Sequence, residues 1–255
     1  FFMIAILLCA GFAVRMYPLT RDFPKPLLPI ADRPVIDYLM DQMLRFKDLR
    51  AIHVISNACF HDHFDNWRKT WLPALAPHGI ALQIHNDGAT TNGNRLGACG
   101  DLQFGLREIA GTSKMLVSGG DNIFRFEIEP LWQRFIKSQD HFIIALPEMD
   151  KTRLQKTGVL TLVADDRVLR LHEKPQDPPS TWCCPPIYFL QPSAGERLDE
   201  FMRLSQHRDA PGHFIDYLCQ KERVYAFKVN AGGRLDIGNM DSYRQADELM
   251  RSDPS

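Results

Sequence analysis

Short apolar runs alternate with amphipathic stretches through the first half of the chain. The runs are four to six residues long and predict buried strands at 3–8, 51–56, 80–85, 115–118 and 142–146. Apolar residues at helical spacing, such as Val35, Leu39 and Met43, predict helices at 34–46, 61–72, 98–109 and 129–137. Since strands that alternate with helices form βαβ units, this half predicts a mostly parallel sheet.

The pattern changes after Pro147, where short strands with polar links replace the alternation. The predicted strands are 158–163, 168–172, 187–190 and 224–229, and the predicted helices are 195–204, 213–221 and 240–250. The chain has no internal repeat, low-complexity tract or long linker. We therefore expect one α/β domain over 3–250, with a Rossmann-like mixed, mostly parallel sheet flanked by helices.

Composition and charge narrow the class of protein. The formal net charge of the 255 residues is -1, which gives no support for a nucleic-acid partner. The apolar start is too short to span a bilayer and lacks the basic region of a signal peptide. The six cysteines show no Cys-x-x-Cys spacing, so we expect free thiols and a cytoplasmic protein without a membrane partner.

The segment after the first predicted strand combines small and cationic residues. Gly11 and Ala13 follow the strand, Arg15 comes next, and Lys25 lies between two prolines. Small residues let backbone amides approach phosphate oxygens, whose charge the two cations can neutralise. Because ligands of open α/β sheets bind beyond the carboxyl ends of strands, this segment predicts a phosphate-binding loop.

Two aspartates follow later in the chain. Asp121 comes after an apolar strand and two glycines, and Asp236 lies in the run 234–238. A carboxylate at the end of a strand suits Mg²⁺ held against phosphates. A turn aspartate that caps the following structure is the alternative for Asp121. The residues alone do not show whether the two carboxylates converge.

Taken in order, these motifs resemble those of the sugar-1-phosphate nucleotidyltransferases, also called nucleotide-sugar pyrophosphorylases. Gly11, Arg15 and the block 24–30 match the N-terminal signature of that family. Ala13 departs from it, because the family has glycine there, and Val14 stands where the family has threonine. Both departures lie in the loop that the family uses for the triphosphate.

The resemblance implies a role for each motif, with the nucleotide in the N-terminal half and the sugar phosphate in the C-terminal half. It implies catalytic roles for Arg15 and Lys25, and nucleotide binding by Ala10, Gly11, Phe12, Ala13, Gly97 and Asp121. It further implies sugar-phosphate binding by Gly158, Glu173 and Lys174, and metal binding by Asp121 and Asp236. The implied cofactor is Mg²⁺, and the implied partners are an NTP and a sugar-1-phosphate.

The expected reaction joins the NTP to the sugar-1-phosphate and releases pyrophosphate, with the fold of the nucleotide-diphospho-sugar transferases. A relative that binds nucleotide without turnover is the alternative, which Ala13 and Val14 motivate. A dinucleotide oxidoreductase is disfavoured because G-x-G-x-x-G is missing at Gly11. The residues do not fix the oligomeric state, and a homodimer stays open.

Two further features bear on specificity and on metals. Pro185-Pro186 stands where the family often has Asn/Thr-Gly, and proline removes a backbone donor, so we expect a sugar pocket that differs from the common hexose site. His61 and His63 have no cysteine or third ligand nearby in the sequence, so we interpret them as the start of a solvated helix rather than a metal site.

Overall fold

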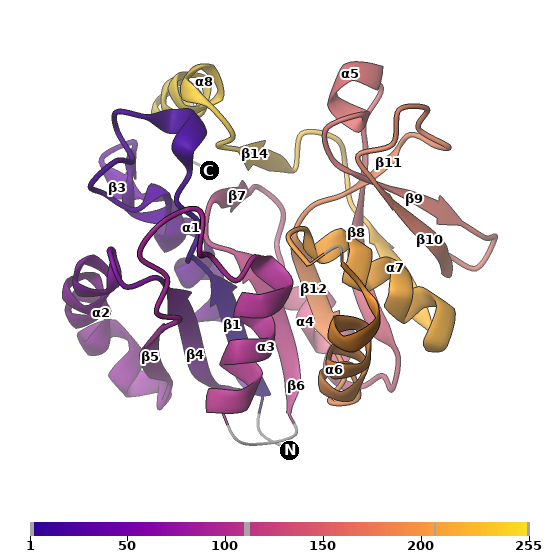
Figure 1. Ribbon diagram of the computed structural model, residues 1–255, viewed down its shortest axis with the longest axis horizontal. Helices are drawn as coiled ribbons and strands as arrows, with labels where there is room; N and C mark the ends of the chain where they lie inside the picture. The colour runs from indigo at the N-terminus through magenta and orange to yellow at the C-terminus, as the bar shows by residue number, and fades with distance from the viewer. Residues whose placement is uncertain (1–2, 110–112, 207, 254–255) are drawn as a thin grey trace.

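The computed structural model describes residues 3–109, 113–206 and 208–253, and a long central sheet organises it (Figure 1). β1 (Met3–Leu8) lies between β4 (Leu49–Ser56) and β6 (Lys114–Gly119) and pairs in parallel with both. β5 (Ala81–Asn86) adds a further parallel strand beside β4. The carboxyl ends of these four strands therefore meet at one edge of the sheet.

Beyond β6 the sheet becomes mixed. β12 (Ile187–Leu190) runs antiparallel between β6 and β8 (His141–Pro147), and β13 (Val224–Lys228) pairs in parallel with β8. The expected mixed, mostly parallel sheet is thereby confirmed. β12 runs antiparallel to β8 because it continues in the direction of β11 (Trp182–Cys184), which ends two residues earlier and is itself antiparallel to β8.

The sheet divides at the two prolines that precede β12. β11 (Trp182–Cys184) pairs with the end of β8 on one side and with β9 (Gly158–Leu162) on the other, and β9 pairs with β10 (Val168–Glu173). Pro185-Pro186 separates β11 from β12, since neither proline can donate to a ladder. A smaller lobe consists of α5 (Lys151–Leu154), β9, β10 and β11. β11, which the sequence pattern did not predict, joins this lobe to β8.

Helices cover both faces of the sheet. The helices on one face are α1 (Val35–Met43), α2 (His61–Leu75) and α4 (Glu129–Ile136), and those on the other are α3 (Ala98–Glu108), α6 (Ala194–Leu204) and α7 (Pro211–Lys221). In β1, Ala5 and Leu7 face the first group, while Ile4 and Ile6 face the second. Both faces are apolar because a parallel sheet is buried on both sides.

A separate apolar cluster joins the two ends of the described chain. α8 (Met240–Ser252) packs against the N-terminal segment through Ala246 and Met250, which contact Leu28 and Ile30 within one buried cluster. The short elements of this region are η1 (Val14–Met16), η2 (Lys25–Leu27), β2 (Pro29–Ile30), β3 (Arg33–Pro34), β7 (Asn122–Phe124) and β14 (Arg234–Asp236). The packing brings the last strand beside the N-terminal segment that the sequence predicts to bind phosphate.

Element boundaries differ modestly from the sequence-based expectations. Pro34 precedes the helix instead of opening it, and α1 ends at Met43 rather than at residue 46. α2 continues through Pro73 to Leu75 even though the proline cannot donate to the carbonyl four residues earlier, and burial of Trp71 and Leu75 supports this last turn. η3 (Ala76–His78) then ends at Gly79, which has a positive φ of 63°.

Two expectations from composition concern cysteines and membranes. The six cysteines are free thiols, as expected. Within the ranges that the structure describes, none of the helices has the length and hydropathy needed to cross a membrane.

Candidate active site

The loop after β1 presents backbone rather than side chains. Ala10 and Phe12 are buried, and the Phe12 ring packs 5.9 Å from that of Phe60. Gly11 is exposed, and a Cβ placed on it would have no neighbour within 4 Å. The predicted nucleotide-binding residues of this loop therefore offer their peptide groups, with Arg15 exposed just beyond them.

Ala13 adopts the left-handed conformation, with φ 46° and ψ 41°. Its carbonyl accepts hydrogen bonds from the Thr20 hydroxyl at 2.9 Å and from the Met16 amide at 2.9 Å, which hold the turn. A residue with a Cβ is strained in this region, whereas glycine is not. The loop thus keeps the glycine-type backbone at the position where alanine replaces the family's glycine.

We expect Ala13→Gly to raise the free energy of unfolding by about 0.5–1 kcal/mol, because it removes left-handed strain that outweighs the added unfolded-state entropy. Urea denaturation measures the change. Ala74→Gly, at an exposed position inside α2, is the matched control and should lower stability by about 1 kcal/mol. Equal losses in both variants would contradict the interpretation.

Lys25 is a nearly buried cation with a carboxylate partner. Its Nζ lies 2.6 Å from Oδ2 of Asp121, and only 8% of the residue is exposed. Pro24 and Pro26 flank it, so the backbone that carries the lysine is stiff before any ligand binds. The structure therefore brings together one predicted catalytic residue and one predicted metal ligand.

Asp121 follows β6 through two closely packed glycines. A Cβ on Gly120 would lie 2.5 Å from the Cys9 sulfur and 3.3 Å from Cβ of Pro26, so this turn excludes any side chain. Burial raises the pKa of Asp121, but the charges of Lys25 and Arg234 outweigh that effect and leave the pKa below its usual value. The carboxylate is thus held ionised.

Asp236 reaches the same place through a two-stranded ribbon that the sequence pattern did not predict. β14 pairs antiparallel with β7, and Asp236 lies directly opposite Asn122, the neighbour of Asp121. The Asn122 amide donates to Asp121 Oδ1 at 2.7 Å, and Arg234 Nε donates to Asn122 Oδ1 at 2.6 Å. Arg234 also pairs with Asp236 Oδ1 at 3.2 Å. One polar chain therefore links the two carboxylates.

The donor set fits a hard divalent ion of the Mg²⁺ type. The Asp121 side chain is 35% exposed and that of Asp236 is 56% exposed, so both are accessible to an ion from solution. Mg²⁺ is commonly held by one or two carboxylates together with substrate phosphates and water. Among the described residues there is no group of three or more His, Cys, Asp or Glu side chains placed to hold a metal without such help, and this includes His61 and His63.

The smaller lobe carries the predicted sugar-phosphate residues. Gly158 lies opposite Glu173 in the β9–β10 ladder, and a Cβ on it would stand 3.0 Å from Leu171 Cδ2. The Glu173 carboxylate rests against Gly212 in the first turn of α7, where the helix N-terminus favours negative charge. Lys174 has a positive φ of 48°, and its Nζ lies 3.7 Å from Glu173 Oε1.

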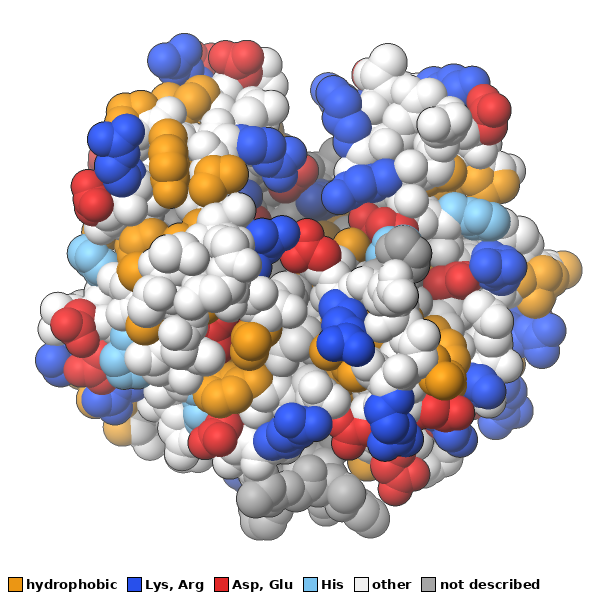
Figure 2. Space-filling view, viewed as in Figure 1, with side chains coloured by type: hydrophobic (Ala, Val, Ile, Leu, Met, Phe, Trp, Pro, Cys, Tyr) orange, Lys and Arg blue, Asp and Glu red, His pale blue; other side chains and the backbone are white. Residues whose placement is uncertain are grey.

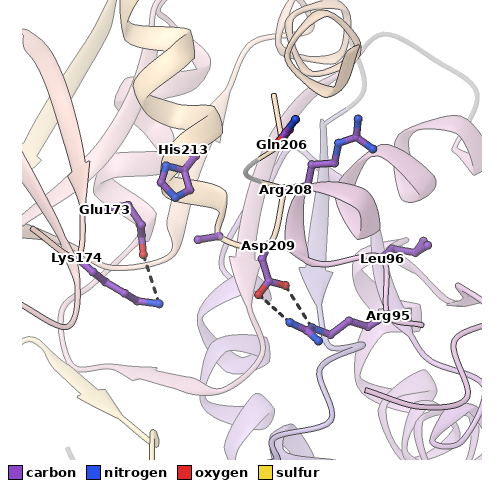
Figure 3. Close-up of a pocket in the computed structure, with 9 residues that line it drawn as sticks. Arg95, Leu96, Glu173, Lys174, Gln206, Arg208, Asp209 and His213 are labelled. Carbon is purple, nitrogen blue, oxygen red and sulfur yellow. Dashed lines mark hydrogen bonds and ion pairs between the residues drawn. The ribbon is translucent and has the colours of Figure 1, made fainter. Parts of the chain in front are cut away.

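A cleft of about 520 Å³ extends from Glu173 and Lys174 to Arg95 and Leu96, which precede α3 (Figure 3). Its remaining lining residues are Gln206, Arg208, Asp209, Ala210 and His213. Figure 2 shows the molecule hollowed between the part that carries α8 and the part that carries α5, with lysine and arginine side chains on both walls. Such a surface suits an anionic ligand.

Sequence reasoning missed Arg95 and Arg208. Arg95 pairs with Asp209 on one side of the cleft, with 2.8 Å between Nη2 and Oδ2 (Figure 3). Arg95 directly precedes Leu96-Gly97, so its place beside a glycine motif was an available signal. Arg208 lies in a polar linker between two helices, where no spacing distinguishes it from a solvated charge.

Gly97 lies beneath the linker that joins α6 to α7. Its φ is 77°, and a Cβ on it would stand 3.0 Å from Cα of Asp209. The first amides of α3, those of Ala98 and Cys99, donate to the carbonyls of Asp209 and Arg208. Close packing therefore accounts for the glycine, and its contact with a nucleotide stays a prediction.

Pro185-Pro186 lies beside the turn that leads to Asp121. The Gly119 amide donates to the Pro186 carbonyl at 3.1 Å, which anchors the prolines beside the glycines before Asp121. The pair therefore lies close to the predicted ligands, as a determinant of the sugar pocket would require. Its effect on specificity stays a prediction.

Comparisons with known proteins identify related sequences and folds. A family model described as nucleotidyl transferase matches residues 4–253. The chain is 24% identical over 247 residues to a bifunctional protein GlmU of Methanocaldococcus jannaschii, an alignment that covers 96% of this chain and 54% of the relative. It is 23% identical over 261 residues to a UTP–glucose-1-phosphate uridylyltransferase of Staphylococcus epidermidis, covering 92% of this chain and 87% of the relative.

A solved structure shares the fold. The crystal structure of a UDP-glucose pyrophosphorylase complexed with UDP-glucose superposes with a TM-score of 0.81 at 17% identity, covering 99% of both chains. The present chain spans about half the length of the archaeal relative, 54%.

Proposed function

We propose, because this chain belongs to the nucleotidyl transferase family, that it joins an NTP to a sugar-1-phosphate and releases pyrophosphate. The single observation that carries the proposal is the polar chain from Lys25 through Asp121 to Asp236. This chain, together with the lysine and arginine side chains on both walls of the hollow in Figure 2, suits two phosphorylated substrates that must meet.

In this reaction a phosphate oxygen of the sugar-1-phosphate attacks the α-phosphorus of the NTP in line, and pyrophosphate leaves with the bond electrons. The protein has little covalent chemistry to perform, so positioning and charge carry most of the effect. We assign Arg15 and Lys25 to the triphosphate and the departing pyrophosphate. Gly158, Glu173 and Lys174 hold the sugar phosphate in the proposal.

We place Mg²⁺ at Asp121 and Asp236. When bound, this ion would screen the negative charge of the two approaching phosphates. The polar chain through Asn122 and Arg234 links the two carboxylates before the ion arrives. The charges of Lys25 and Arg234 also hold the pKa of Asp121 below its usual value. Lys25, already paired with Asp121, is then next to the metal-bound phosphates.

A nucleotide-binding protein without turnover is the competing function. Ala13 motivates it, because the family's glycine is missing there, but the loop keeps the left-handed backbone that glycine would adopt. The polar chain around Asp121 also favours turnover, since binding alone requires no second carboxylate at Asp236.

A pyrophosphate-release assay tests the proposal with five NTPs against a panel of sugar-1-phosphates, each with and without Mg²⁺. We expect one or a few substrate pairs to release pyrophosphate, and only with the divalent ion. Saturable NTP binding without release for any pair would instead support the binding protein.

A further inference from the structure

Two acidic side chains meet at the base of the segment that joins β5 to α3. Asp87 directly follows β5 and is half-buried, whereas Asp101 lies on the first turns of α3 and is only 6% exposed. Neither has a role in the reaction proposed above. Buried acids without an ionic partner are costly, so this pair requires a physical explanation.

The contacts of the pair leave one oxygen on each residue without a donor. Asp87 Oδ1 accepts a hydrogen bond from the Ala89 amide at 2.7 Å. Asp87 Oδ2 and Asp101 Oδ1 are buried and receive no hydrogen bond from any other group of the described chain. The two carboxyl groups are neighbours that influence each other's pKa. Since ionised carboxylates only accept, a hydrogen bond between them exists only when one of them is protonated.

The surroundings favour the neutral acid. Burial is the largest effect that raises the pKa of Asp101, to about 8, and the nearby charges of Asp87 and Asp209 add to it. Arg95 acts in the opposite direction without overcoming the rise. The neighbouring thiols of Cys9 and Cys99 add no further negative charge, because burial raises the pKa of both.

We propose that Asp87 and Asp101 share one proton, and that their acid–carboxylate hydrogen bond positions segment 88–97 on the nucleotide side of the cleft. The bond joins the two ends of that segment, one after β5 and the other in α3. The segment carries Arg95, whose guanidinium donates to the Asn92 carbonyl at 2.6 Å and pairs with Asp209 at 2.8 Å. Only the identity of the ligand in this inference rests on the proposed function.

Loss of the proton places two like charges together in a poorly solvated site. Their repulsion separates β5 from α3 and loosens the segment between them. Nucleotide affinity is therefore expected to fall as the pH rises through about 8, whereas the paired form persists at neutral pH. Asp87 and Asp101 act here as positioning residues, because they need not touch the nucleotide.

Nucleotide affinity measured by calorimetry from pH 6 to 9.5 tests the inference, with the NTP selected by the turnover screen. For the wild type the Kd should rise about tenfold between pH 7 and pH 9, as the loss of one required proton predicts. Asp101→Asn and Asp87→Asn should each flatten that rise, since one amide can replace the shared acid. Glu108→Gln, an exposed acid on the same helix, should keep the wild-type profile.

Thermal stability without nucleotide provides a readout that does not depend on the proposed function. Folded Asp101 keeps a proton that the unfolded chain releases near its ordinary pKa, so the stabilisation is complete at low pH and is lost as the pH rises toward about 8. The wild-type Tm should therefore fall relative to that of Asp101→Asn over this range.

Two results would overturn the inference, and a third would support it while refuting the proposed function. Wild-type pH profiles retained by both asparagine variants would overturn the shared proton. A rise in Tm with Ca²⁺ or Mg²⁺ that either variant abolishes would show a bound cation instead, and would also overturn it. A pH-dependent Tm difference with no NTP binding at any pH would support the shared proton while refuting the proposed function. Asp87→Asn keeps the test decisive if Asp101→Asn does not fold, because Asp87 is less buried.

Discussion

Lys25→Ala is expected to lower kcat by about 100-fold or more, the scale of losing one preorganised charge contact to a transition state. The ammonium already lies 2.6 Å from Asp121 and is held by a stiff, nearly buried segment, so no reorganisation is needed when charge develops on the pyrophosphate. Steady-state kinetics with the preferred substrate pair measure the change. KM for the NTP should change less than kcat.

Removal of Lys25 also leaves the Asp121 carboxylate without its closest cation, so a loss of folding must be distinguished from a loss of chemistry. Lys25→Met keeps the length and the packing of the side chain, and should show a similar loss of kcat with a smaller loss of Tm. Lys151→Ala removes an exposed lysine of the smaller lobe and should leave kcat unchanged. A folded Lys25→Met enzyme with near-full turnover would remove Lys25 from the catalytic machinery.

Asp121→Asn and Asp236→Asn are each expected to abolish Mg²⁺-dependent turnover while the fold persists. Asp236 lies opposite Asn122 in the ribbon and is linked to Asp121 through two side chains, so both carboxylates serve one place. The double variant should then be little worse than either single variant, because loss of one carboxylate already dismantles the site. Kinetics at several Mg²⁺ concentrations provide the measurement.

Separate roles for the two aspartates would give a different result. The defect of the double variant would then equal the product of the single defects. Asp177→Asn, an acid with a 93% exposed side chain on the smaller lobe, is the matched control and should keep its Mg²⁺ dependence. Retained circular dichroism in every variant separates a lost metal site from a lost fold.

Strong periodicity made most of the fold predictable. Apolar runs such as β1 and β8 are buried on both faces, so their composition alone identifies them. The order of the motifs also led to a prediction of the site residues, of which the structure brings Lys25 and Asp121 together. The ribbon of β7 and β14 was not predictable, because three-residue strands separated by about a hundred residues carry no periodic signal. Only tertiary packing creates that pairing.

The same limit applies to the site. Lys25 and Asp121 each follow a recognisable local pattern, yet their 2.6 Å contact depends on how the glycines before Asp121 pack against Cys9. Asn122 and Arg234 link the two carboxylates, but the resemblance assigned neither of them a role. Asp87 and Asp101 were overlooked because neither lies in a motif, and an acid is expected at the surface unless burial is known.

The apolar cluster beneath α8 sets an order of events during synthesis. Residues 234–252 are made last among the described residues, yet they supply Asp236 and the guanidinium that orients Asn122. A nascent chain can complete β1, its loop and β6 much earlier, and that intermediate holds Lys25 beside Asp121 without the second carboxylate. We therefore expect the proposed metal-dependent chemistry to begin only after α8 has docked on the N-terminal segment, so a chain cut short before α8 should keep the predicted phosphate-binding loop without a working site.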